Sequence, residues 1–286
     1  MKTTVIGLVF ICLSVLCFSQ APTEKALLWK ISGNSLETPS HLYGTFHLLC
    51  PEDLVFDSTI TAALQGSRTL FLELDMTDQK VMMKAFSGSL MKDGKTLEDL
   101  YTDSIYRIIH DSLQAMTSMP MMMLEKMKPA LLVSAIYPSL LGCNVGSPEM
   151  NLANLAKKNG TPVKGLESVE EQMAAFDAIP LMDQAEMLRT YLLEAGEAKR
   201  ELMDMLALYR TKDVMGMASM FENTEEGWGK YEEDLLIKRN KTWISRITEQ
   251  TKIEQTFFAV GAGHLGGDQG IISLLRKAGF TVEPVY

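Results

Sequence analysis

The sequence predicts an α/β fold in which strands and helices alternate near both ends of the chain and enclose a helical middle section. Two observations predict it. Short apolar runs alternate with helix-like segments at each end, and the residues between them are rich in Met and Leu at helical spacing. The length of 286 residues and the hydrophobic fraction of 47% are typical of a soluble globular protein with one large domain or two small ones.

The chain is acidic. It carries 27 Lys and Arg residues against 36 Asp and Glu residues, a formal net charge of −9, and no dense basic run. An acidic protein repels the phosphates of nucleic acids and of anionic membrane surfaces. We therefore expect a peptide or small-molecule partner and no nucleic acid.

The first twenty residues, 1–20, predict a signal peptide. Lys2 precedes an apolar run over 5–18, and Ser19-Gln20-Ala21 offers small or polar residues for cleavage. This run of 14 residues is shorter than the span of about 20 that a membrane-crossing helix needs. We expect export to the periplasm or the extracellular space, a mature domain over 21–286 and no stable membrane span. An uncleaved signal anchor is the alternative.

The first half of the mature chain begins with two predicted strands, over Ala26–Ile31 and His41–His47, joined by a turn-rich loop. A short helix follows, capped by Asp57 or Ser58 and ending at Gly66. The remaining elements of this half are a buried strand over 69–75, a helical insertion over roughly 78–150 with proline breaks, and a helix over 151–159.

The second half begins with a strand over Pro162–Leu166. Ser168 and Glu171 then form a capping box that starts a helix. Further helices are predicted over 181–210 and 230–250. A strand, a loop, a helix and a strand end the chain, over 255–260, 261–267, 268–278 and 281–285.

Export changes how the cysteines are interpreted. Cys12 and Cys17 would leave with the signal peptide, whereas Cys50 and Cys143 would remain. An oxidising compartment permits a disulfide between the remaining two, and two buried thiols are the alternative. Neither has metal-type spacing to another cysteine, so the sequence leaves the pairing open.

Two of the four histidines stand in the same local frame, Gly44-Thr-Phe-His47 and Gly261-Ala-Gly-His264, and each follows a predicted strand. Side chains at the carboxyl ends of strands converge in the ligand crevice of an open α/β sheet. Two neutral imidazoles and a carboxylate are suitable ligands for a divalent transition metal. A hydrogen-bonded core histidine is the alternative for each, but the repeated frame favours a metal site.

Glu73 is the expected carboxylate because it interrupts an apolar strand, and a buried unpaired carboxylate needs a metal, a cation or a proton. A solvent-facing acid at the strand end is the alternative. Glu167 occupies a comparable place after the strand at 162–166. It is a further ligand, a general base, or an acid favoured near a helix N-terminus.

Arg239 and Asn240 lie on or beside the apolar stripe of a predicted helix that also carries Trp243 and Ile247. A guanidinium and an amide on such a face need buried partners. Arg239 is therefore either a group that holds a substrate carboxylate or an oxyanion, or the partner of a structural acid.

Five motifs follow one another along nearly the whole mature chain, from about residue 27 to 286. They are Leu42-Tyr-Gly44-Thr-Phe-His47-Leu48, Leu72-Glu73-Leu74-Asp75, Gly165-Leu-Glu167 followed by Gln172, Arg239-Asn240, and Val260-Gly-Ala-Gly-His264-Leu-Gly-Gly267. Together they resemble the TraB/GumN/PrgY family. That family is similar to the Tiki metalloproteases and, more distantly, to erythromycin esterase-like and haem-binding ChaN-like proteins.

The resemblance implies a mixed central sheet flanked by helices, with a large helical insertion, and a divalent-metal hydrolase. It implies that His47, Glu73 and His264 are essential and that Arg239 and Asn240 are accessory residues. It assigns no role to the loop at 147–151, which reads Ser-Pro-Glu-Met-Asn where relatives often carry Gly-x-Asp.

The leading hypothesis is a metal-dependent hydrolase of amide or peptide bonds. His47, Glu73 and His264 would bind Mn, Co or Zn, Glu73 or Glu167 would accept a proton, and Arg239 would stabilise the developing oxyanion. The alternative is a non-catalytic exported binder of a peptide, haem or another small ligand in the same crevice. A signal-anchored regulatory protein is a third hypothesis.

Overall fold

The computed structural model describes residues 24–222 and 227–286, so the predicted signal peptide at 1–20 lies outside the described residues. The described chain contains a six-stranded sheet in the order β4-β3-β5-β2-β1-β6. The strands are β1 (Leu28–Gly33), β2 (Ser40–Thr45), β3 (Thr69–Leu72), β4 (Val163–Gly165), β5 (Thr256–Gly261) and β6 (Phe280–Val285).

The sheet is mixed, which confirms the predicted fold class. Strands β4, β3, β5 and β2 run parallel to one another, whereas β1 is antiparallel to both β2 and β6. The four parallel strands therefore all end at the same edge of the sheet. Whatever follows them in the chain is brought together there.

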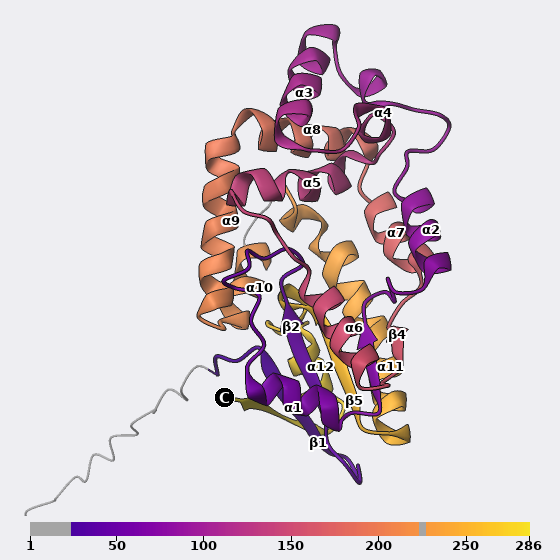
Figure 1. Ribbon diagram of the computed structural model, residues 1–286, viewed down its shortest axis with the longest axis vertical. Coiled ribbons are helices and arrows are strands. Elements are labelled where there is room, and N and C mark those ends of the chain that lie inside the picture. The colour runs from indigo at the N-terminus through magenta and orange to yellow at the C-terminus, as the bar shows by residue number, and fades with distance from the viewer. Residues whose placement is uncertain (1–23, 223–226) are drawn as a thin grey trace, which may run out of the picture.

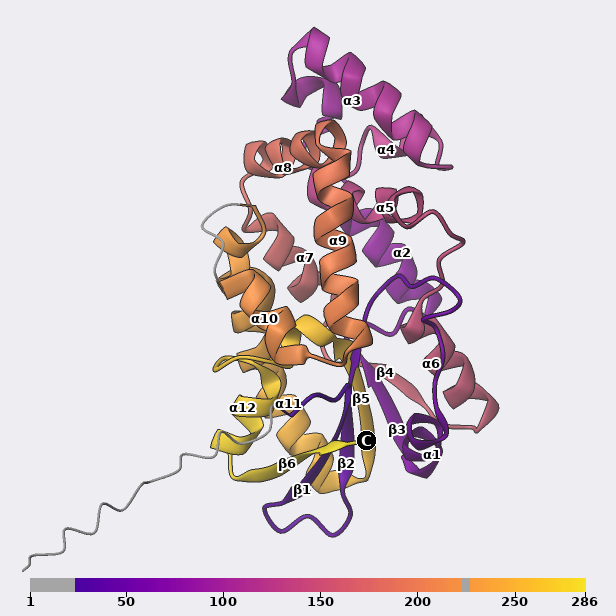
Figure 2. The same ribbon diagram turned by 90° about the vertical axis from the view of Figure 1, so that its left-hand side faces the viewer.

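Helices cover both faces of the sheet and extend beyond one end of it (Figures 1 and 2). In the described residues they are α1 (Ser58–Gly66), α2 (Gln79–Gly88), α3 (Asp103–Met116), α4 (Met121–Leu124), α5 (Pro129–Leu141), α6 (Pro148–Lys158), α7 (Val169–Asp177), α8 (Leu181–Leu193), α9 (Ala195–Arg210), α10 (Val214–Glu222), α11 (Lys238–Ile253) and α12 (Ile271–Lys277). Figure 2 shows α9 reaching from the sheet to α3, α5 and α8 at the far end.

The molecule has two main hydrophobic cores. The first surrounds the sheet and includes Trp243, Phe257 and Phe258, all fully buried. The second lies among α3, α5, α8 and α9 and consists largely of Leu and Ile. Phe46, which directly precedes His47, packs against both cores. The loop after β2 therefore lies where the two cores meet.

Local sequence signals explain several element ends. The Asp57 side chain caps α1, and Ser168 and Glu171 form the predicted capping box of α7. Strand β3 ends at Leu72 rather than at Asp75, and in the turn that follows the Asp75 carboxylate accepts hydrogen bonds from the Thr77 amide and hydroxyl.

The prediction of a helix over 151–159 was wrong at its N-terminus, since α6 begins at Pro148. Ser147 caps this helix by accepting a hydrogen bond from the Met150 amide, and proline is favoured in the first helical turn. The earlier start places Glu149 in the first turn of α6.

The two cysteines whose pairing the sequence left open form a disulfide, Cys50–Cys143. An isolated antiparallel bridge between Leu49 and Gly146 lies beside it, with both backbone hydrogen bonds made. Together they fasten the loop after β2 to the segment that precedes α6. Among the described residues no helix is both long enough and apolar enough to cross a bilayer.

We expect the disulfide to contribute substantially to stability. It joins residues 93 apart in the sequence, and closing a loop of this size is worth roughly 4 kcal/mol through the lost entropy of the unfolded chain. Urea denaturation of the mature protein should give a lower unfolding free energy after reduction. A Cys50→Ser/Cys143→Ser variant should have the same unfolding free energy as the reduced protein, and adding the reductant should not change it. Equal midpoints for the oxidised and reduced forms would contradict the expectation.

Candidate metal centre

Each of the four parallel strands delivers one polar side chain to the shared edge of the sheet. His47 follows β2, Glu73 follows β3, and Glu167 follows β4. His264 follows β5 and ends a single 3-10 turn, Ala262–His264. The structure therefore brings together side chains that are up to 217 residues apart in the sequence, as the strand-end argument predicted.

Three of these side chains surround Gly261. A Cβ atom on Gly261 would lie 3.3 Å from Glu73 Oε1, 3.6 Å from His47 Nε2 and 3.6 Å from His264 Cδ2. Glu73 Oε1 also lies 3.9 Å from His264 Nε2 and accepts a 2.8 Å hydrogen bond from the Gly261 amide. Glycine at this position leaves the space between the three groups free of a side chain.

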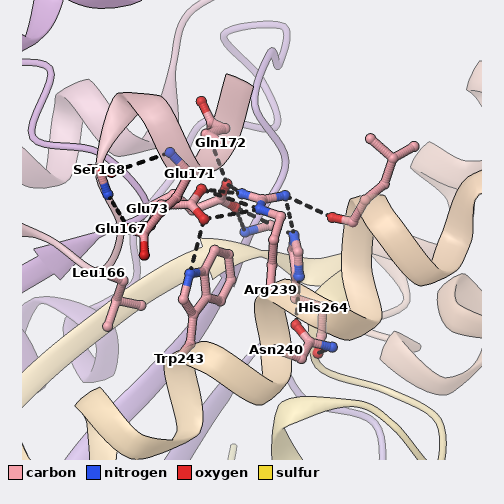
Figure 3. Close-up of polar contacts among 12 residues, drawn as sticks. Glu73, Leu166, Glu167, Ser168, Glu171, Gln172, Arg239, Asn240, Trp243 and His264 are labelled. Carbon is pink, nitrogen blue, oxygen red and sulfur yellow. Dashed lines mark hydrogen bonds and ion pairs between the residues drawn. The ribbon is translucent and has the colours of Figure 1, made fainter. Parts of the chain in front are cut away.

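Arg239 lies between the acids and His264 (Figure 3). Its Nη2 bonds to Glu73 Oε2 and Glu167 Oε1, both at 2.6 Å, and its Nε bonds to the Glu167 carboxylate. Its Nη1 donates to the Leu235 carbonyl at 2.9 Å and to His264 Nε2 at 3.2 Å. A guanidinium has five N–H donors, so every donor of Arg239 is committed to a protein group.

The contacts of Arg239 leave it no free donor for a substrate. Arg239 would have to break one of them before it could bind a substrate oxyanion, so oxyanion stabilisation by Arg239 stays a prediction. The side chain of Glu167 is 2% exposed and also accepts a hydrogen bond from Trp243 Nε1. Burial raises the pKa of Glu167, and the hydrogen bonds and charge of Arg239 oppose the rise.

Glu73 is kept ionised. Burial alone would raise the pKa of its carboxyl, but the positive charge of Arg239 and the nearby His264 and His47 lower that pKa far below its ordinary value. Gln172 donates a further hydrogen bond of 3.3 Å to its Oε2. An anionic carboxylate with Oε1 facing two imidazoles is suited to bind a cation.

His264 is buried and held in one orientation by Asn240. The Asn240 amide nitrogen donates to the carbonyls of His264 and Gln269, so its oxygen faces the ring and accepts from His264 Nδ1 at 2.7 Å. The ring also packs against Trp243, with centroids 4.6 Å apart. Burial and the charge of Arg239 lower the pKa of His264 to about 3, so its Nε2 carries a lone pair.

His47 forms the open side of the site, with a side chain that is 68% exposed. Its Nδ1 donates to Glu149 Oε1 at 2.8 Å. Desolvation opposes a charge on the ring, but the hydrogen bond and charge of Glu149, aided by Glu73, raise the pKa of His47 to about 9. His47 and His264 therefore differ strongly in their surroundings.

Glu149 is the residue of this site that sequence reasoning missed. The resemblance gave the loop at 147–151 no role, because it departs from Gly-x-Asp. The structure places Glu149 against His47, in the first turn of α6. Ser147 and Pro148 are residue types typical of a helix start, and they were the local signal that could have placed Glu149 in a first helical turn.

The donor set fits a divalent transition-metal ion. Two imidazoles and one carboxylate are typical ligands of such ions, and both rings have Nδ1 bonded to an oxygen. The Nε2 of His47 lies beside Gly261, and the Nε2 of His264 lies 3.9 Å from Glu73 Oε1. Within residues 24–222 and 227–286 no three acidic, histidine or cysteine side chains already lie at ligating distance from one point. Binding would therefore require Arg239 to release His264 Nε2.

A family comparison agrees with the motifs. The model of the TraB/PrgY/gumN family matches residues 27–284, which is nearly all of the described chain. The chain belongs to this family. No solved structure gives a significant match.

Several relatives of this TraB/PrgY/gumN family member are named metalloproteases. The chain is 24% identical to Metalloprotease TIKI2 of Danio rerio over 90% of its own length and 60% of that protein. It is 23% identical to Metalloprotease TIKI1 of Homo sapiens, over 90% of the chain and 61% of the relative. A TIKI homolog of Nematostella vectensis is 22% identical over 94% of the chain and 69% of its own length. The chain thus spans about three-fifths of the first two relatives.

The ion network gives a prediction for stability. Arg239, Glu73 and Glu167 have side chains that are 12%, 9% and 2% exposed. Replacing Arg239 by Met leaves two carboxylates buried without a cation, which should lower the unfolding free energy by roughly 3–5 kcal/mol in urea denaturation. Adding Glu167→Gln should restore part of the loss, because one of the two unpaired charges is removed.

A surface ion pair is the matched control. Arg189 pairs with Glu186 on α8, and their side chains are 36% and 59% exposed. Arg189→Met should cost less than about 1 kcal/mol, because solvent screens exposed pairs. If Arg239→Met were as stable as this control, the network would not hold the sheet edge together.

Proposed function

We propose that this protein is a divalent-metal-dependent hydrolase that acts on amide or peptide bonds. The observation that carries the proposal is the meeting of His47, Glu73 and His264 around Gly261. Three different strands precede them in the chain, and Gly261 adds no side chain to the space that they surround. The names of the TIKI relatives support the reaction class, because those proteins are called metalloproteases.

His47 Nε2, Glu73 Oε1 and His264 Nε2 are the proposed ligands. Their nitrogen and oxygen donors suit Zn, Co or Mn. Such an ion, when bound, supplies Lewis acidity and eases the ionisation of water near neutral pH. The negative charge of Glu73 offsets part of the charge of the cation. The two imidazoles, when neutral, add no charge of their own.

The protein groups around the ligands have separate tasks. Glu167 holds Arg239 in place through three hydrogen bonds, and Arg239 balances the charge of Glu73. Glu167 is also the proposed proton acceptor, because burial raises the pKa of its carboxyl. Asn240 fixes the His264 ring. The exposed side of His47 is the side from which water and substrate would enter.

The proposed substrate is a peptide or a small amide, and the proposed setting is outside the cytoplasm. The disulfide Cys50–Cys143 supports export, since such bonds persist in oxidising compartments. The predicted signal peptide at 1–20 is consistent with this setting, and the acidic net charge disfavours nucleic acid.

Metal binding is the first test. Calorimetric titration of the mature protein with Mn, Co and Zn should reveal one site, and His47→Ala/His264→Ala should abolish it. His110→Ala is the matched control, because His110 lies on α3 in the helical part of the molecule and pairs with Asp111. Equal uptake by the wild type and the double variant would overturn the proposed ligands.

Turnover is the second test. A peptide-library digest should show cleavage that needs added Mn, Co or Zn, stops with a chelator, and is lost in Glu73→Gln. A protein that retains a peptide, haem or other ligand and shows no chelator-sensitive cleavage would instead be a binder that uses the same crevice.

A further inference from the structure

The ring of His47 has a partner on the side that faces away from the proposed ion. Glu149 Oε1 lies 2.8 Å from His47 Nδ1, whereas His47 Nε2 lies on the Gly261 side. The two ring nitrogens point in different directions, so Glu149 does not reach the space that the ligands surround. Glu149 therefore touches that space only through the ring of His47.

The Glu149 carboxylate is itself fixed in place. Its Oε1 accepts a second hydrogen bond, from Thr45 Oγ1 at 2.7 Å, and its Oε2 accepts one from Ser147 Oγ at 2.7 Å. The side chain is only 16% exposed, and Thr45 is fully buried at the end of β2. A carboxylate with three donors on its two oxygens has little freedom to turn away from His47.

The two segments that carry Glu149 and His47 are also joined to each other. The Leu49–Gly146 bridge and the Cys50–Cys143 disulfide both link the loop after β2 to the residues before α6. Glu149 lies three residues from one of these links and His47 two residues from the same one. The contact between Glu149 and His47 is therefore made between two segments that a disulfide and a backbone bridge already hold together.

We infer that Glu149 is a positioning residue for His47, an inference that rests on the proposed function. By accepting a hydrogen bond from Nδ1, Glu149 fixes the ring orientation and keeps Nε2 turned toward the place of the ion. The corresponding partner of His264 is a neutral amide, Asn240. The negative charge of Glu149 makes His47 the more strongly donating imidazole of the two.

The test is the affinity of the mature protein for Co and Zn, measured by calorimetric titration. Glu149→Leu removes the acceptor and should weaken the affinity by about 10- to 100-fold, as loss of such a partner typically does. Glu149→Gln keeps the size and one acceptor oxygen but removes the charge, so its affinity should lie between those of Glu149→Leu and the wild type. Thermal melts of each variant show whether it folds.

Two controls separate positioning from a general structural effect. Asp111→Asn removes the carboxylate partner of another histidine, His110, and should leave the affinity unchanged. In a His47→Ala background, Glu149→Leu should cause a much smaller loss than in the wild type, because only the direct attraction between the carboxylate and the ion remains. If Glu149→Leu weakened the metal affinity by the same factor with and without the His47 ring, the inference would be overturned.

The outcomes also distinguish this inference from the proposed function. If the wild type binds no Mn, Co or Zn, the proposed function fails and the positioning role fails with it. If the wild type binds and His47→Ala binds more weakly, while folded Glu149→Leu and Glu149→Gln bind as tightly as the wild type, only the role of Glu149 is wrong.

Discussion

The guanidinium of Arg239 is the positive charge on which the carboxyl edge of the sheet depends. Glu73 and Glu167 leave neighbouring parallel strands and are both buried, so their charges would repel each other in a poorly solvated place. Arg239 bonds to both and uses its other donors on the Leu235 carbonyl and His264. One side chain from α11 therefore stabilises three strand ends and sets how Glu73 faces the space beside Gly261.

The site is asymmetric in its two histidines, although they share one sequence frame. His264 is buried, held by an amide and packed on Trp243, which keeps the ring neutral. His47 is exposed and held by a carboxylate, which favours a protonated ring before any ion binds. His264 therefore lies in the buried interior of the site, and His47 lies on its solvent-exposed side.

The helical part of the molecule does more than cover the sheet. Glu149 lies at the end of the segment predicted as an insertion, and it supports a histidine that belongs to the sheet. The disulfide and the Leu49–Gly146 bridge hold those two parts together. Phe46 packs into both hydrophobic cores, so the loop that carries His47 is anchored on either side.

Local patterns in the sequence were enough to predict the strands and the α/β class. They also predicted that His47, Glu73, Glu167 and His264 follow strand ends. Apolar periodicity and the repeated glycine frame are local signals, and parallel strands bring their carboxyl ends to one edge. Three features could be seen only in the folded molecule: Arg239 has no free donor, Cys50 pairs with Cys143, and Glu149 bonds to His47. These contacts join residues that are far apart in the sequence, 102 positions in the last case. They depend on strand order and on how the inserted helices pack, which no local pattern encodes.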